Sequence, residues 1–258
     1  MGTKKEKIGK LLIAVSAIII LAVLSFISPI SQDIGYHNFS DTSSFLSIPN
    51  TLNVLSNLPF LIVGIWGLIK LLRDKSLNVL YENKLAYVAL FLGSALVAFG
   101  SGYYHLWPDN QTLVWDRLPM TIAFMGLVSI IISEFISLKL GKVLLLPLLL
   151  FGLFSVLYWH YTEQKLMGDL RPYVFVQFFP ILTIPIVLLL FTPKFNQISC
   201  YWWLLATYVL AKVFEFFDYS LHEILTVVSG HSIKHIAAAV GLYILIKGYQ
   251  TRDSINAR

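Results

Sequence analysis

Long apolar runs separated by short polar connections dominate this chain. A helix needs about 20 apolar residues to cross the hydrocarbon core of a membrane. Eight such runs follow one another, at residues 9–29, 51–71, 85–105, 116–136, 142–160, 172–191, 200–218 and 229–249. They are too long for barrel strands, and a backbone exposed to lipid must satisfy its own hydrogen bonds, so each run is predicted to be a helix. The pattern predicts an all-α, polytopic membrane helix bundle.

The composition supports this fold class. Hydrophobic residues make up 57% of the 258-residue chain, charged residues 13%, and the mean hydropathy is +0.74. A soluble domain has about 45–50% apolar and about 25% charged residues, and a chain of this length could not bury the excess. The single cysteine, Cys200, excludes an internal disulfide and a cysteine-based metal site. Short connections and the lack of an internal repeat favour one compact bundle.

The basic residues predict how the bundle is oriented. The net charge of +5 is not a nucleic-acid signature, because the basic residues alternate with the apolar runs. Most of them lie before the first run, in alternate connections and after the last run, at Lys4, Lys5, Lys7, Lys10, Lys70, Arg73, Lys75, Lys84, Lys139, Lys142, Lys194, Lys247, Arg252 and Arg258. The other connections hold only Arg117, Lys165 and Arg171, among most of the acidic residues. The positive-inside rule then predicts that both termini are cytoplasmic.

The first run has two interpretations. A basic start followed by an apolar run and Ser-Pro-Ile-Ser is also the pattern of a signal peptide. The uncharged stretch is long for that role, so we expect an uncleaved helix. The predicted organisation is an N-terminal membrane helix over residues 1–30, a core over residues 31–250 and a cytoplasmic tail over residues 251–258.

Ionisable residues inside predicted membrane spans gather at one depth. Such residues are costly in a bilayer and by default indicate a functional site. On the predicted topology the outer ends of three spans carry Ser101, His105, Asp116, His231, Lys234 and His235. The sequence therefore predicts a polar site just inside the non-cytoplasmic face.

The spacing of the histidines is that of a metal site. His231 and His235 are four residues apart, so both rings leave one face of a helix. With His105 as a third ligand, a zinc ion would have three nitrogens and one open position, as in catalytic zinc sites. Asp116 follows His105 after a tight loop and is a candidate general base. Ser101, one turn before His105, would either stabilise the oxyanion or orient a zinc-binding histidine. The alternative is that these histidines form hydrogen bonds between helices, a common use of polar residues in membrane bundles.

Three neighbouring charges have other expected roles. Lys234 lies off the histidine face of its helix, so we expect it to pair with an acidic neighbour or to snorkel. Lys212 and Glu215, three residues apart, are predicted to form an ion pair. Asp218 is expected either to cap the outer end of its span or to face the site.

These residues resemble the motifs of a known family. Ser101-x3-His105, Asp116 within WDRLPM, and His231-x3-His235 within SGHSIKH are similar to the alkaline ceramidase family, part of a wider membrane-hydrolase group that includes adiponectin-receptor-like proteins. IPNTLNVLSNLPFLIVG (Ile48 to Gly64) and KVFEFFD (Lys212 to Asp218) resemble its bacterial branch. The resemblance covers roughly residues 36–247.

The resemblance implies a seven-helix core, here spans two to eight, with the first helix as an addition. It implies a zinc-dependent amidase that cleaves the N-acyl bond of ceramide-like lipids to a sphingoid base and a fatty acid. His105, His231 and His235 would bind zinc, and Ser101 and Asp116 would be catalytic. The implied partners are a lipid amide and the bilayer.

One departure concerns calcium. Eukaryotic members carry an acidic site of the form Asp-Trp-x-Glu-x-Asn before the first core helix. Here the region reads QDIGYHNFSDTSSFLSIPN, which has Asp33, Asn38, Asp41 and Asn50 but no Glu or Trp. Calcium needs six or more oxygen ligands, commonly from several carboxylates, so we do not predict calcium dependence.

Two other classes of function fit parts of the pattern. The first is a metal-containing lipid-binding or receptor-like membrane protein without turnover. The second is a retinal or proton-handling seven-helix protein, in which Lys234 would carry a Schiff base with Asp116 as counter-ion. The three histidines argue against the second class, since a retinal pocket has no need of them.

Overall fold

The structure is a computed structural model that describes residues 3–255, and helices make up almost all of its regular secondary structure. The α-helices are α1 (Lys4–Phe26), α2 (Thr51–Leu55), α3 (Leu58–Leu68), α4 (Lys84–Leu106), α5 (Leu113–Ile131), α6 (Leu138–Gln164), α7 (Arg171–Leu190), α8 (Ser199–Phe216), α9 (Asp218–Leu225) and α10 (Gly230–Thr251). Short 3-10 segments are η1 (Ile34–His37) and η3 (Tyr81–Asn83), and π-helical turns η2 (Ile69–Arg73) and η4 (Ile132–Ile136) end α3 and α5. No β-sheet is present within residues 3–255.

The predicted class of an all-α membrane bundle is confirmed. Among residues 3–255, six helical segments are long and apolar enough to cross a membrane: Lys4–Phe26, Thr51–Arg73, Tyr81–Leu106, Leu113–Ile136, Leu138–Gln164 and Arg171–Leu190. The bent pair α8 and α9, whose axes differ by 78°, makes a seventh where it is counted as one span. The protein is therefore an integral membrane protein. Helix α10 lies where the eighth span was predicted but is not among these segments, and it carries His231, Lys234, His235 and Lys247.

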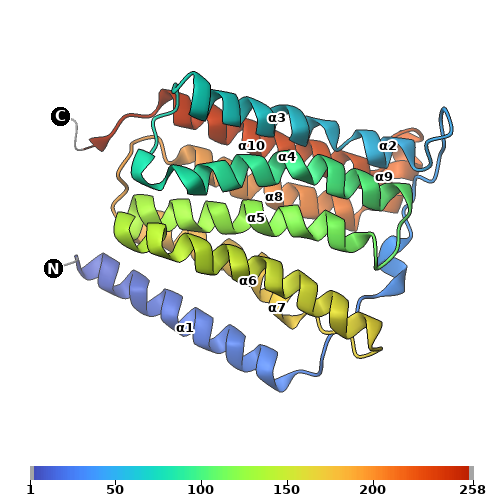
Figure 1. The fold of residues 1–258 in the computed structure, drawn as a ribbon, viewed down its shortest axis with the longest axis horizontal. Coiled ribbons are helices and arrows are strands. Elements are labelled where there is room, and N and C mark those ends of the chain that lie inside the picture. The colour runs from blue at the N-terminus through green and yellow to red at the C-terminus, as the bar shows by residue number, and fades with distance from the viewer. Residues whose placement is uncertain (1–2, 256–258) are drawn as a thin grey trace.

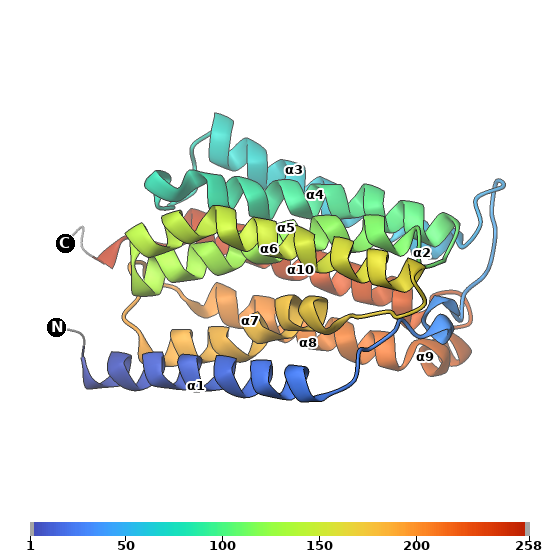
Figure 2. The same ribbon diagram turned by 60° about the horizontal axis from the view of Figure 1, so that its bottom comes forward.

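The helices form one elongated bundle (Figure 1). The beginning of α1 and the end of α10 lie at the same end of the bundle, called here the terminal end. The end of α4, the beginning of α5 and the beginning of α10 lie at the opposite end, called here the site end. Helix α1 runs along the outside next to α7 (Figure 2) and has one buried residue, Gly9. Its position agrees with an addition to a core made by the later helices.

Helices α4 and α5 approach each other very closely at the site end. A Cβ atom at Gly100 would lie 1.9 Å from the backbone oxygen of Trp115, so only glycine allows this contact. Pro119, four residues after Trp115, has no N–H to bond that oxygen within the helix. The neighbours of the contact in the sequence are Ser101 and Asp116. The close approach of the two backbones therefore sets the separation of two predicted site residues.

A buried ion pair, called here the terminal clamp, holds the terminal end together. Arg252 donates from Nη2 to Oε1 of Glu134 (2.5 Å) and from Nη1 to Oε2 (2.8 Å). The hydroxyls of Tyr87 and Tyr201 donate to the same two oxygens, at 2.5 and 2.7 Å. Both charged side chains are buried. The clamp joins the end of α10 to η4, and it places Arg252, which lies in the predicted tail, inside the bundle.

Candidate metal centre

Three buried histidines meet at the site end of the bundle. His105 comes from the last turn of α4, and His231 and His235 come from the first turns of α10. Each offers a ring nitrogen, and the three nitrogens lie within 4.8 Å of one another. The Nε2 atoms of His105 and His231 are 3.3 Å apart. The structure thus brings together all three histidines of the predicted ligand set, from two helices far apart in the sequence.

The donor set fits a zinc ion. Structural surveys of zinc proteins show imidazole nitrogens as ligands, and catalytic sites use three protein ligands with one open position. The Nδ1 atom of His235 is 2.8 Å from the Ser56 hydroxyl, which leaves its Nε2 atom free to bind a metal. A hydrogen bond on the second ring nitrogen commonly orients a metal-binding histidine. These residues could hold a metal ion, and its identity as zinc belongs to the proposal below.

The kink between α8 and α9 positions the start of α10. The Ser229 side chain caps α10 by accepting from the Ser232 backbone N–H (3.1 Å). Asp218 accepts from the His231 backbone N–H at 2.7 Å. A Cβ atom at Gly230 would lie 2.3 Å from the Phe214 backbone oxygen, so glycine permits the tight packing of α10 on the kink. Asp218, expected either to cap its own span or to face the site, instead fixes the backbone of a metal-ligand candidate.

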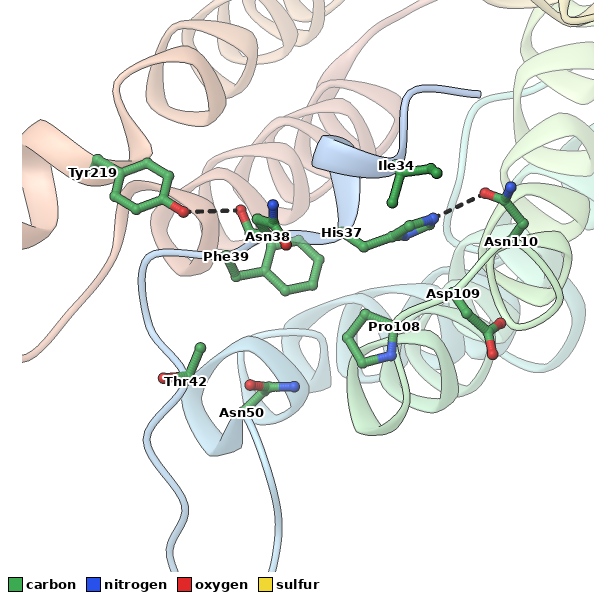
Figure 3. Close-up of a pocket in the computed structure, with 10 residues that line it drawn as sticks. All are labelled: Ile34, His37, Asn38, Phe39, Thr42, Asn50, Pro108, Asp109, Asn110 and Tyr219. Atoms are coloured by element: carbon green, nitrogen blue, oxygen red, sulfur yellow. Dashed lines mark hydrogen bonds between the residues drawn. The ribbon is translucent and has the colours of Figure 1, made fainter. Parts of the chain in front are cut away.

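The segment after η1 covers the histidines from the site end. The ring of Phe39 packs against the rings of His105 and His231, with centroids 4.7 and 4.4 Å away. The other side of Phe39 lines an open hollow of about 750 Å³ (Figure 3). His37 borders the same hollow and is 2.9 Å from both the Tyr104 hydroxyl and the Asn110 side-chain oxygen. Phe39 therefore separates the hollow from the histidine cluster.

Ser101 and Asp116 lie on the wall of a second, deeper cavity. This internal cavity has a volume of about 430 Å³, and His235 also lines it. The five predicted site residues thus lie at one end of the bundle, and three of them share one cavity.

The internal cavity has a polar end and an apolar remainder. Besides the site residues, its charged and amide side chains are Gln32, Arg117, Gln177, Lys212, Glu215 and Lys234, and its hydroxyl side chains are Tyr36, Ser94, Tyr173, Thr207 and Tyr208. Most of the rest is apolar and includes Leu90, Leu127, Ile181, Ile184, Leu204 and Leu242. This division suits an amphiphile with one polar group and one chain.

The predicted Lys212–Glu215 ion pair is confirmed in that lining, and Lys234 takes one of its two expected roles. Lys212 pairs with Oε2 of Glu215, as the three-residue spacing indicated. Lys234 pairs with Oε1 of the same carboxylate at 2.6 Å. The prediction that Lys234 would pair with an acidic neighbour is therefore correct.

Three residues of this region were not among the predicted site residues. Ser56 contacts His235, and the Asn50 side chain donates to the His105 backbone oxygen at 2.8 Å. A lone serine or asparagine in an apolar run gives no signal of its partner, although both lie in the stretch that carried part of the family resemblance. Arg117 was counted with the connections, and the structure instead places it in the second turn of α5, 6% exposed.

The region of the doubtful calcium site forms local turns. Asp33 accepts from the backbone N–H of Gly35 (2.9 Å), and Asp41 accepts from that of Ser43 (2.9 Å). The histidine cluster is the only group of three or more candidate ligands found among residues 3–255. Calcium binding stays untested.

The fold and the site together define an integral membrane protein with a buried three-histidine centre beside an amphiphilic cavity. A family model described as Ceramidase matches residues 45–257. The match covers most of the chain, which therefore belongs to the ceramidase family, and the family resemblance seen in the sequence is confirmed. Membership implies an amide hydrolase that acts on a lipid amide. Searches of curated proteins and of solved structures each found no match.

Proposed function

We propose that this protein is a zinc-dependent intramembrane amidase that cleaves the N-acyl bond of ceramide-like lipids. The observation that carries the proposal is the buried cluster of His105, His231 and His235 beside a cavity that also presents Ser101 and Asp116. In a chain of the ceramidase family, this arrangement joins a candidate metal site, a carboxylate and a lipid-sized space. We propose the three histidines as zinc ligands.

The reaction is the hydrolysis of an amide. The bond between the acyl carbon and nitrogen breaks, a bond from water oxygen to the acyl carbon forms, and the proton of water ends on the leaving nitrogen. Zinc at the histidines would supply Lewis acidity, which polarises a carbonyl and lowers the pKa of water from 15.7 toward about 7. The products are a fatty acid and a sphingoid-type amine.

Asp116 is assigned the proton transfers. Its carboxylate lines the cavity, where it can take a proton from water and deliver it to the amine nitrogen. The Ser101 hydroxyl, which lines the same cavity, orients this carboxylate or donates to the developing oxyanion. His235 has Ser56 as its hydroxyl partner, so Ser101 is not needed to orient that ring.

The substrate would lie with its amide at the polar end of the internal cavity. Its acyl chain would follow the apolar lining toward Leu127 and Leu242. Burial of each methylene group contributes about 0.8 kcal/mol, so the chain would supply much of the binding free energy.

The proposal includes the membrane topology. We propose eight spans, namely α1 followed by a core of seven that ends with α10, and both termini on the cytoplasmic side. The terminal and site ends are opposite ends of the bundle, so the centre would then face the non-cytoplasmic side (Figure 1). The bent helix pair α8 and α9 would count as one span.

The proposal is tested on detergent-purified protein by measuring bound zinc and the release of fatty acid from a short-chain ceramide. His231→Ala and His235→Ala should each lose bound zinc and hydrolysis together. His160→Ala is the matched control, because His160 contacts Gln164 on α6 and lies outside the cluster.

Three outcomes separate the alternatives. Unchanged zinc and hydrolysis in both cluster variants would remove the zinc centre from the mechanism. Stoichiometric zinc without hydrolysis of any amide or ester across a lipid panel would favour the receptor-like alternative. A visible absorption band on adding retinal would favour a Schiff base on Lys234.

A further inference from the structure

The polar end of the internal cavity carries more positive than negative side chains. Arg117, Lys212 and Lys234 line it, and their acidic counterparts in the lining are Asp116 and Glu215. The excess is one positive charge before any metal ion is counted, and a zinc ion would add two more. A cavity of this charge selects an anionic ligand, because charge is weakly screened where water is scarce.

Arg117 is the most unusual of these cations. Its side chain is buried, and Nη2 donates to the Gln32 side-chain oxygen at 2.6 Å. Its Nη1 atom is buried with no hydrogen-bond partner among residues 3–255. The guanidinium lies over the rings of Trp159 and Tyr173, with centroids 4.4 and 4.6 Å away. No carboxylate forms an ion pair with it among residues 3–255.

A buried arginine in this state indicates a missing acceptor. Burying a guanidinium costs several kcal/mol unless an anion or enough hydrogen bonds compensate for it. The aromatic faces compensate in part. The planar fork of arginine matches carboxylate, sulfonate and phosphate oxygens, often through two parallel hydrogen bonds. An anionic ligand in the cavity would complete the set of partners for Arg117.

The lysine pair has donors to spare as well. Glu215 accepts one hydrogen bond from Lys212 and one from Lys234, so each of its oxygens is used. Each ammonium group has three N–H donors, and a single carboxylate neutralises only one of the two lysines. Lys234 is one residue before His235 in the sequence, so the spare positive charge lies near the candidate metal centre.

We propose that the natural substrate is an N-acyl lipid whose amine portion carries an anionic oxygen group, bound by Arg117 together with Lys212 and Lys234. The acyl chain occupies the apolar part of the internal cavity, and the anionic group lies at its polar end. This inference rests on the proposed function, because it names the substrate class of the same site.

The test compares matched acidic and neutral substrates of equal acyl length. One pair is N-dodecanoylglycine and N-dodecanoylethanolamine, which tests a carboxylate. The other is a short-chain ceramide 1-phosphate and the same ceramide, which tests a phosphate. In at least one pair, kcat/KM should favour the acidic member by about 10-fold or more, the lower end for a charge-assisted hydrogen bond. Equal or preferred cleavage of the neutral member in both pairs would overturn the proposal.

Variants of Arg117 and Lys212 test whether these cations cause the preference for acidic substrates. Arg117→Gln and Lys212→Met should each lower the acidic-to-neutral ratio of kcat/KM by about 10-fold. Both kcat/KM values are measured on one preparation, so their ratio is independent of the fraction of folded protein. If Arg117→Gln fails to fold, the Lys212→Met variant alone tests the proposal, because Lys212 is partly exposed. Lys142→Met, an exposed position on α6, removes a positive charge away from the cavity and should keep the wild-type ratio. A ratio that is unchanged in both cavity variants would also overturn the proposal.

A binding measurement keeps this inference separate from the proposed function. Thermal stabilisation of the purified wild type by dodecyl phosphate is compared with that by dodecanol. We expect stabilisation by dodecyl phosphate alone, at concentrations about 10-fold higher for Lys212→Met. If no amide is hydrolysed, the amidase proposal fails while this result still judges the anion site. Equal stabilisation by the phosphate and the alcohol would remove the anion site even if ceramide is hydrolysed.

Discussion

Two buried arginines show how differently the two ends of this bundle use charge. At the terminal end, Arg252 meets both oxygens of Glu134, and the tyrosine hydroxyls complete the carboxylate. At the site end, Arg117 has an amide and aromatic rings as neighbours and keeps a buried Nη1 atom without a partner among residues 3–255. A buried charge with all its partners inside the protein serves the fold. A buried charge that lacks a partner is available to a ligand.

This contrast makes opposite predictions for the two ends. Conservative changes at the site end should remove activity and leave the free energy of unfolding nearly unchanged. Changes in the terminal clamp should lower the free energy of unfolding and leave the activity of the folded protein nearly unchanged.

The largest expected effect is on catalysis. Asp116→Asn keeps the shape of the side chain but removes the base, so kcat should fall about 10²- to 10⁴-fold. The measurement is fatty-acid release by purified protein, with bound zinc and unfolding in denaturing detergent as controls. Activity within threefold of wild type would exclude Asp116 as the proton-transfer group.

Breaking the terminal clamp is expected to have an effect of comparable size on the free energy of unfolding. Glu134→Ala leaves Arg252 buried without its anion, which should lower the free energy of unfolding by about 3–5 kcal/mol. Unfolding in denaturing detergent measures this loss, and kcat of the remaining folded protein should change little. The control is Asp74→Asn, which breaks the partly exposed Lys70–Asp74 pair and should have no measurable effect on stability. A clamp variant as stable as this control would contradict the contrast.

Gly100→Ala should lower both the free energy of unfolding and kcat. In Gly100→Ala the added methyl group meets the Trp115 backbone oxygen, so α4 and α5 must separate. Overpacking of this kind costs about 1–3 kcal/mol, and kcat should fall as well because Ser101 and Asp116 move apart. Gly102→Ala is the matched control, since a Cβ there would meet only Val54, at 4.0 Å. If the two variants behave alike, the close approach does not set the geometry of the site.

The smallest expected effect is on metal affinity. Ser56→Ala removes the hydroxyl that contacts Nδ1 of His235, and loss of such a partner typically costs about 10- to 100-fold in metal affinity or activity. Zinc titration against a competing chelator measures the change. Ser25→Ala, on the exposed face of α1, is the control. An unchanged zinc affinity in Ser56→Ala would mean that His235 does not depend on this serine.

The helices and the pairing of His231 with His235 could be predicted from the sequence, because both depend on short-range periodicity, whereas His105 was added from its predicted depth and from the family resemblance. A run of about 20 apolar residues has one stable form in lipid, and two histidines four apart share a helix face in any context. The roles of the clustered histidines as ligands, and those of Ser101 and Asp116 in catalysis, remain predictions until the variants are measured.

What the sequence could not predict depends on tertiary contacts. The sequence around the 78° bend at Phe217 contains no proline or glycine that would predict a bend. The hydrogen bond from the His231 backbone N–H to Asp218 was therefore not predicted. Ser56 becomes meaningful only beside His235. Arg117 was counted as a flanking charge because positive residues near a span end usually are, and only the structure shows it buried under aromatic rings.

The terminal clamp also has a consequence for biosynthesis. Glu134 and Arg252 are 118 residues apart in the chain. At a translation rate of about 5–20 residues per second, the glutamate exists for roughly 6–24 s before its partner is made. During that interval η4 cannot settle into its final burial with a charged carboxylate. We therefore expect the terminal end of the nascent protein to close only late in its synthesis, once Arg252 has been made.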